Sequence, residues 1–154
     1  LHHTQKRLSR MLARHSEVTW AAEQLLLGEV TSQITEDMIL AIDPGDLNRD
    51  GAPKSEHRGR VRDGDAGDIV GGYPMISVVA RDVRQRITLP VLTRLLSAKR
   101  EGYRSENTDI VSVMDEVSRH LRVSPLWVID RGGDRGRLWS AWFEGGYRML
   151  VRAA

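Results

Sequence analysis

The 154-residue sequence contains no cysteine, and this absence excludes several kinds of chemistry. Without cysteine the chain forms no disulfide, uses no thiol nucleophile and binds no zinc through sulfur. It also lacks any apolar run near the roughly 20 residues that a membrane helix needs. The opening residues LHHTQKRLSR lead into no apolar segment of the kind found in secretory signals. We therefore expect a cytoplasmic protein that does not enter a membrane.

What the sequence does contain is an ordinary globular composition with unevenly placed positive charge. Hydrophobic residues make up 40% and charged residues 29%, values that fit one folded domain rather than a disordered chain. The net charge is only +2, but basic residues gather along the chain. They are Lys6, Arg7, Arg10 and Arg14; Arg58, Arg60 and Arg62; and Arg81, Arg84 and Arg86. Arginines at alternate positions either form a solvated edge or contact phosphate groups, and composition does not decide between the two.

The first 32 residues have the pattern of a helical segment. Apolar residues between positions 4 and 30 recur near the 3.6-residue period of a helix. Ser16 is placed to cap a second helix within this stretch. Because the segment is basic as well as amphipathic, it either belongs to a DNA-binding region or covers part of a sheet.

Residues 37–154 show the alternation of strands and helices that is typical of an α/β domain. Strands are expected at 37–43, 73–82, 86–98, 126–130 and 147–152, and helices at 105–121 and 134–145. The order after the N-terminal helices is therefore β-β-β-α-β-α-β. No helix-sized segment separates 73–82 from 86–98, so these strands should pair as an antiparallel hairpin, interrupted near Pro90. Residues 44–72 are rich in Gly, Asp and Arg and are expected to form a long exposed loop.

Two of the expected strands end alike, because DMILAID (37–43) and LWVID (126–130) are short apolar runs that close on an aspartate. The helix between them favours parallel strands, which would bring Asp43 and Asp130 together at neighbouring carboxyl ends. Adjacent carboxylates repel one another, and a cation between them relieves that repulsion. Oxygen ligands without cysteine favour a hard ion such as Mg²⁺. The plainer interpretation is that each aspartate is a turn or cap residue, as is expected for Asp134 at the start of its helix.

Several motifs together resemble those of a known enzyme family. In chain order they are LAID near the first strand, RVRDGD followed by GGY, SEN before a helix, WVIDRGGDR, and a final YRMLVR. Over roughly residues 37–152 this series resembles the DDE transposases of bacterial insertion sequences, with WVIDRGGDR its most specific part. The resemblance implies a ribonuclease H-like fold with a mixed sheet, in which Asp43 matches the first catalytic aspartate and Asp130 the second.

The resemblance also implies an activity. Members of this family perform cut-and-paste transposition: they hydrolyse DNA at transposon ends and join the freed 3′ hydroxyl to target DNA. They use two Mg²⁺ ions, for which Mn²⁺ can substitute, and act on DNA as homodimers. For this chain the resemblance implies that Asp43 and Asp130 each hold a metal ion.

Four arginines are candidates for contacts with DNA phosphates. Arg58, Arg60 and Arg62 lie downstream of Asp43, where they could reach the same edge of the sheet. Arg131 follows the second aspartate directly, and it either contacts a phosphate or pairs with the carboxylates.

The chain departs from the family pattern at the third catalytic residue, a glutamate on a helix beyond the last core strand. Glu144 lies before that strand, and Glu116 lies on the long helix; both are expected to be exposed. Nucleases proper of the ribonuclease H class carry a glutamate on that long helix, so a nuclease that does not transpose is an alternative. The sequence also begins without methionine. We therefore expect a fragment with two of three metal ligands, which does not cut DNA by itself.

A further alternative comes from DLNRDG (46–51), which matches the opening of a calcium-binding loop. Asp46, Asn48 and Asp50 would supply the oxygen ligands. Such a loop closes with a carboxylate at its twelfth position, which is His57 here, and a strand rather than a helix precedes it. A calcium-dependent binding module that uses residues 46–57 is thus an alternative, and a turn rich in Asp, Asn and Gly is the preferred interpretation.

Overall fold

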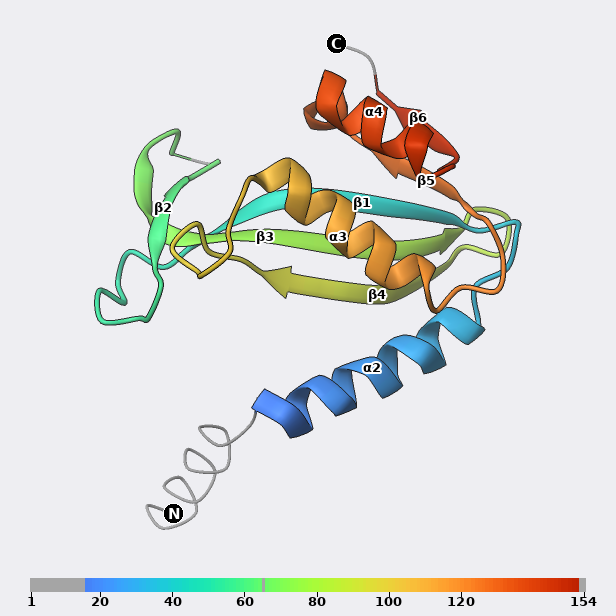
Figure 1. Ribbon diagram of the computed structural model, residues 1–154, viewed down its shortest axis with the longest axis horizontal. Helices are drawn as coiled ribbons and strands as arrows, with labels where there is room; N and C mark the ends of the chain where they lie inside the picture. Colours follow the sequence, from blue (N-terminus) through green and yellow to red (C-terminus); the bar gives the residue numbers. More distant parts are fainter. Residues whose placement is uncertain (1–15, 65, 153–154) are drawn as a thin grey trace.

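The computed structural model describes residues 16–64 and 66–152 (Figure 1). In chain order its elements are α2 (Ser16–Ser32), β1 (Ile39–Asn48), β2 (Gly59–Arg62), β3 (Ile69–Asp82), β4 (Ile87–Leu95), α3 (Glu106–Ser118), β5 (Leu126–Ile129), the 3₁₀ turn η1 (Arg131–Gly133), α4 (Gly136–Glu144) and β6 (Met149–Val151). Within this part of the chain no helix is both long and apolar enough to cross a membrane. The first helix predicted for the N-terminal segment, and its four basic residues, lie outside the described residues.

The strands form one six-stranded mixed sheet in the order β2-β3-β1-β5-β6, with β4 also paired to β3. The long strand β3 runs antiparallel to β1, β2 and β4. On the other side of β1 the sheet continues with parallel strands, since β1 pairs with β5 and β5 with β6. The fold is therefore mixed α/β, as predicted, and is consistent with the ribonuclease H-like class.

The core lies on the face of the sheet that the helices cover, and strand alternation explains which residues enter it. Leu40 and Ile42 of β1 and Trp127 and Ile129 of β5 are almost fully buried, whereas their neighbours along each strand are more exposed. The helices supply the other side of this core with Ile110, Met114, Leu138 and Trp142, and α2 adds Leu27. Figure 1 shows α3 lying along the sheet and α4 beside β5 and β6.

The hairpin of β3 and β4 and the helix after it agree with the sequence prediction. Val78 pairs with Leu92 but Val79 pairs with Pro90, so the strand pairing skips one residue beside the proline, where an interruption was expected. Ser105 caps α3, because its hydroxyl accepts the backbone N–H of Thr108 at 3.2 Å.

The prediction of a continuous loop over residues 44–72 is wrong. β1 extends to Asn48, β2 forms within the segment, and β3 begins at Ile69. Glycines make this pairing possible: a Cβ atom on Gly72 would lie 2.3 Å from the backbone oxygen of Leu47 and 2.5 Å from Val61 Cγ2. The strands here arise from close approach between backbones, which a polar local composition does not reveal.

Candidate metal and nucleic-acid site

The two aspartates singled out by the sequence lie at equivalent places on neighbouring parallel strands, as predicted for the strands. In the pairing of β1 with β5, Ala41 lies opposite Val128. Continuing this register by two residues places Asp43 opposite Asp130. The residues just before them, Ile42 and Ile129, are both buried. Because side chains alternate along extended chain, the two aspartates belong to the opposite face, and both are exposed. The separation of their carboxylates remains a prediction.

Asp43 lies within β1 rather than at its end, which corrects the predicted strand boundary. It pairs with Ser77 of β3, and Pro44 follows it inside the same strand. The pairing with β5 stops at Ala41, so beyond this residue β1 has one open edge. A proline is tolerated on an open edge, since no partner there requires its missing N–H. Asp43 thus occupies the place where β1 no longer has β5 as its neighbour.

Asp130 begins a turn as well as ending a strand. It is the N-cap of η1, and its Oδ1 accepts the backbone N–H of Gly132 at 2.8 Å. The chain then folds back so tightly that a Cβ atom on Gly133 would lie 2.5 Å from Ile129 Cγ2. The second carboxylate oxygen of Asp130 accepts no hydrogen bond from residues 16–64 or 66–152. The cap interpretation therefore holds for Asp130, and one oxygen remains available to a ligand.

The prediction that Asp134 caps α4 is wrong. The N-cap position is Arg135, which makes no side-chain cap, and Asp134 instead accepts the indole N–H of Trp139 at 3.1 Å. Arg135 reaches across to α3, where it pairs with Glu106 and donates to Asn107 Oδ1 at 2.8 Å. This contact joins the SEN and WVIDRGGDR motifs. Arg135 was not among the predicted site residues. Its position as the last residue of WVIDRGGDR, the most specific motif, is the feature of the sequence that could have indicated it.

The side chain of Glu116 makes its contacts away from the two aspartates. Its Oε1 lies 3.1 Å from Arg94 Nη2 and accepts an N–H of Gln24 at 3.0 Å. Arg94 also pairs with Glu23 at 2.6 Å. Since Arg94 belongs to β4, which is separated from β1 by β3, Glu116 is held two strands from Asp43. Only 13% of its side chain is exposed, so the predicted exposed position is wrong. The exposed position predicted for Glu144 is confirmed.

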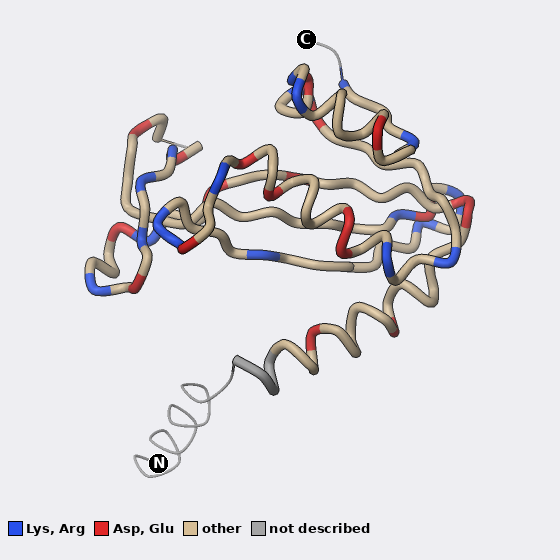
Figure 2. The backbone as a smooth tube through the Cα atoms, in the orientation of Figure 1, with Lys and Arg blue, Asp and Glu red and all other residues tan. Residues whose placement is uncertain are grey.

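The candidate arginines lie at two separate places. Arg131 follows Asp130 and is exposed, so it stands beside the candidate site. Arg60 and Arg62 are exposed on β2, where Arg60 pairs with Gly71. Asp43 pairs six residues further along β3, which corresponds to roughly 20 Å of strand. The structure therefore does not bring the β2 arginines to the aspartates (Figure 2 shows basic residues at both ends of the sheet).

The residues of the calcium alternative lie on or just beyond a strand rather than around a loop. Asn48 donates to Asp63 Oδ2 at 2.6 Å, and Asp46 Oδ2 accepts the backbone N–H of Arg62 at 3.1 Å. Asp50 Oδ1 accepts the N–H of Gly71 at 3.2 Å. These separate partners are unlike the converging oxygens of a calcium loop. Across residues 16–64 and 66–152 there is also no group of three or more His, Asp or Glu arranged to hold a metal.

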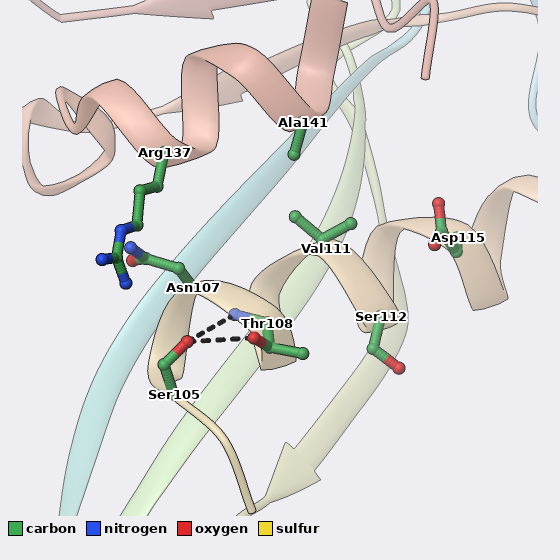
Figure 3. Close-up of a pocket in the computed structure, with 8 residues that line it drawn as sticks. All are labelled: Ser105, Asn107, Thr108, Val111, Ser112, Asp115, Arg137 and Ala141. Atoms are coloured by element: carbon green, nitrogen blue, oxygen red, sulfur yellow. Dashed lines mark hydrogen bonds between the residues drawn. The ribbon is translucent and has the colours of Figure 1, made fainter. Parts of the chain in front are cut away.

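A cavity of about 380 Å³ separates α3 from α4 (Figure 3). It is lined by Ser105, Asn107, Thr108, Val111, Ser112, Asp115, Arg137 and Ala141. Asp115 also accepts a hydrogen bond from the Tyr147 hydroxyl. Burial raises the pKa of Tyr147 to about 12, and the hydrogen bond to Asp115 acts in the same direction.

This shift predicts how Tyr147 titrates. Its pKa in the folded chain exceeds the ordinary value of 10.0, so its contribution to stability is complete below about pH 10 and is lost as pH rises through about 12. In an absorbance titration of the folded protein we expect one of the three tyrosines to ionise near pH 12. Tyr147→Phe should remove that step and leave the others. Ionisation of all three tyrosines together near their ordinary pKa would contradict the assignment.

Comparisons with known proteins include a distant structural similarity. No family model matches the sequence, and no curated protein matches it. Among solved structures the chain is similar to a piggyBac transposase, determined by cryo-EM as a synaptic complex with hairpin DNA. The two are 12% identical with a TM-score of 0.49, and the match covers 81% of this chain and 24% of the transposase chain. The present chain therefore spans about a quarter of that protein's length.

Proposed function

We propose that this chain is part of the catalytic core of a DNA transposase of the insertion-sequence type, with Asp43 and Asp130 as its metal ligands. The observation that supports the proposal is the parallel register of β1 and β5, which, extended by two residues beyond Ala41 and Val128, places these two exposed aspartates opposite each other. The motifs that resemble DDE transposases supply the kind of reaction. The motifs contain both aspartates, and the extended register is consistent with their lying close together.

The residues present fit a hard divalent cation. Asp130 keeps one carboxylate oxygen without a hydrogen bond from the described residues, and Asp43 accepts none from them. Oxygen ligands of this kind suit Mg²⁺ or Mn²⁺. When bound, such ions activate the attacking water or hydroxyl and stabilise the leaving oxygen of a phosphodiester. Two ions are expected in the complete enzyme.

The protein's own groups would position the DNA and the metal. The turn η1 fixes Asp130 through the N–H of Gly132, and the link from Arg135 to α3 holds the following residues in place. Arg131 would contact a phosphate beside the metal, where a guanidinium binds two oxygens at once. In the complete reaction the ends of a transposon are cut and joined to target DNA, and a homodimer on the DNA would bring two such sites together.

The structure disfavours the two other functions considered. A nuclease that does not transpose would use Glu116 beside the aspartates, but that side chain is paired with Arg94 on a distant strand. A calcium module would need Asp46, Asn48 and Asp50 around one ion, and these residues have separate partners.

Linkage between metal and DNA tests the proposed function. If the metal lies between the aspartates and a phosphodiester, DNA must tighten Mn²⁺ binding by the same factor as Mn²⁺ tightens DNA binding. We expect a duplex to raise Mn²⁺ affinity, measured by electron paramagnetic resonance, by about 5-fold or more. Asp43→Asn and Asp130→Asn should remove this effect, whereas Asp50→Asn should not. Mn²⁺ binding that is independent of DNA, or lost only in Asp50→Asn, would refute the proposal.

A further inference from the structure

A second cavity, of about 450 Å³, lies at the other end of the sheet between β2, the start of β3 and the segment after β4. Its lining includes Asp50, His57, Arg58, Arg60, Gly71 and Lys99. Three of these residues are cationic and one is anionic, so the charge inside the cavity is positive. Figure 2 shows basic and acidic residues close together around β2.

Arg58 is a structural part of this cavity. Its Nη1 donates to the backbone oxygens of Arg49 and Asp50, at 3.1 Å and 3.0 Å, and lies 3.7 Å from a carboxylate oxygen of Asp50. The guanidinium rests against Gly71, where a Cβ atom would come within 2.3 Å of Nη1. Arg58 therefore offsets the one negative charge of the cavity, and its own donors are already partly used.

Arg60 and Lys99, in contrast, keep their charges uncompensated. Within residues 16–64 and 66–152, neither side chain has an ion pair or a hydrogen bond, and both are exposed. Two like charges at one cavity repel each other, and an anion bound between them would remove that repulsion. The imidazole of His57 adds a further possible N–H donor on the same lining.

The loops that carry these groups are tied together before any ligand binds. Ser97 is 7% exposed, and its hydroxyl donates to the backbone oxygen of His57 at 2.6 Å. The same hydroxyl accepts the backbone N–H of Lys99 at 2.9 Å. His57 has a left-handed backbone with φ 54°, which keeps its turn tight. One buried hydroxyl thus holds the segments that carry His57 and Lys99 together. Such pre-organisation reduces the conformational entropy that is lost when a ligand binds.

We propose that this cavity binds a backbone phosphate of DNA, with Arg60 and Lys99 as the charged contacts and His57 as an added donor. The choice of DNA rests on the proposed function, whereas the phosphate chemistry rests on the cavity itself. Arg60 lies roughly 20 Å along the strands from Asp43, which corresponds to about six base pairs of a duplex lying along β1 and β3. The contact would thus bind the same duplex at a point distant from the reacting phosphodiester.

Salt dependence tests this assignment. Affinity for a labelled duplex would be measured by fluorescence anisotropy at several salt concentrations in EDTA, so that metal at the aspartates plays no part. For the double variant Arg60→Ala/Lys99→Ala, we expect the slope of log affinity against log salt to become shallower by about 0.9, the contribution of the one phosphate that is no longer neutralised. Arg84→Ala/Arg122→Ala removes the same charge from exposed residues at the opposite end of the sheet and should keep the original slope.

Two results would overturn the assignment. One is an equal change of slope in both double variants, which would show that only net charge matters. The other is tight binding of inorganic phosphate that displaces the duplex, since the ligand would then be a free phosphate and not the DNA backbone. Because no metal is present, failure of the proposed chemistry at Asp43 and Asp130 would leave the expected slopes unchanged. Conversely, failure here would leave the Mn²⁺ linkage at the aspartates intact.

Discussion

Without divalent metal the Asp43→Asn variant is expected to be at least as stable as the wild-type chain, and with Mn²⁺ it is expected to be less stable. Asp43 and Asp130 lie opposite each other when the register of β1 and β5 is extended by two residues, so removing one charge should relieve repulsion in the metal-free protein. In the wild-type chain a bound cation uses both carboxylates. At ten times its dissociation constant, Mn²⁺ should raise the free energy of unfolding by about 1.4 kcal/mol. The variant should lose most of this gain.

Urea unfolding with and without Mn²⁺ measures both effects on one set of proteins. Asp130→Asn should behave like Asp43→Asn. Asp37→Asn is the matched control, since it removes the same charge from an exposed residue before the opposite end of β1. An equal gain from Mn²⁺ in the control and in the Asp43 and Asp130 variants would mean that the cation binds elsewhere. Loss of the gain in Asp50→Asn alone would indicate the calcium-type site instead.

Replacing Trp127 by alanine is expected to have the largest effect on stability. This residue is 2% exposed and lies on β5, where it pairs with Leu40 on one side and Met149 on the other. Its ring also meets Tyr147 edge to face, with centroids 6.3 Å apart. Truncation of a buried Trp costs about 3–5 kcal/mol, because it removes apolar packing and leaves a cavity. That is a large part of the roughly 5–15 kcal/mol that stabilises a typical domain.

Trp20→Ala is the control for this prediction. Trp20 is 61% exposed on α2, so its truncation should change the free energy of unfolding by less than about 0.5 kcal/mol. Denaturant unfolding of the two variants gives the comparison. Similar losses in both would show that β5 is not packed in the core as described. Because β5 positions Asp130, Trp127→Ala should also weaken the stabilisation by Mn²⁺.

Local patterns predicted the parts of the fold that local contacts decide. The apolar run in LWVID and the 3.6-residue spacing after Ser105 are each read along one segment, and β5 and α3 appear where they were expected. The parallel pairing of β1 with β5 also followed, since a helix between two strands of one sheet favours it. The two candidate aspartates were found for the same reason.

Features that depend on distant partners were missed or misjudged. β2 exists because Gly72 of β3 allows a close approach, so the polar segment around it resembled a loop. Glu116 was expected on an exposed face, but Arg94 and Gln24 from other elements cover it. Asp134, which was predicted to cap α4, instead accepts the indole N–H of Trp139, and Asp130 caps the separate turn η1. Such contacts are set by packing, not by sequence period.

The most direct test of a shared metal at Asp43 and Asp130 is a crystal structure of the chain grown with Mn²⁺, with the ion located by its anomalous scattering. Neighbouring strands lie roughly 4.8 Å apart, so we predict carboxylates about 4–7 Å apart with a Mn²⁺ peak between them. Carboxylates more than about 12 Å apart could not share an ion, whose oxygen ligands lie within roughly 2–2.6 Å of it. That separation, or Mn²⁺ bound only at other residues, would contradict the assignment of these aspartates as the metal site.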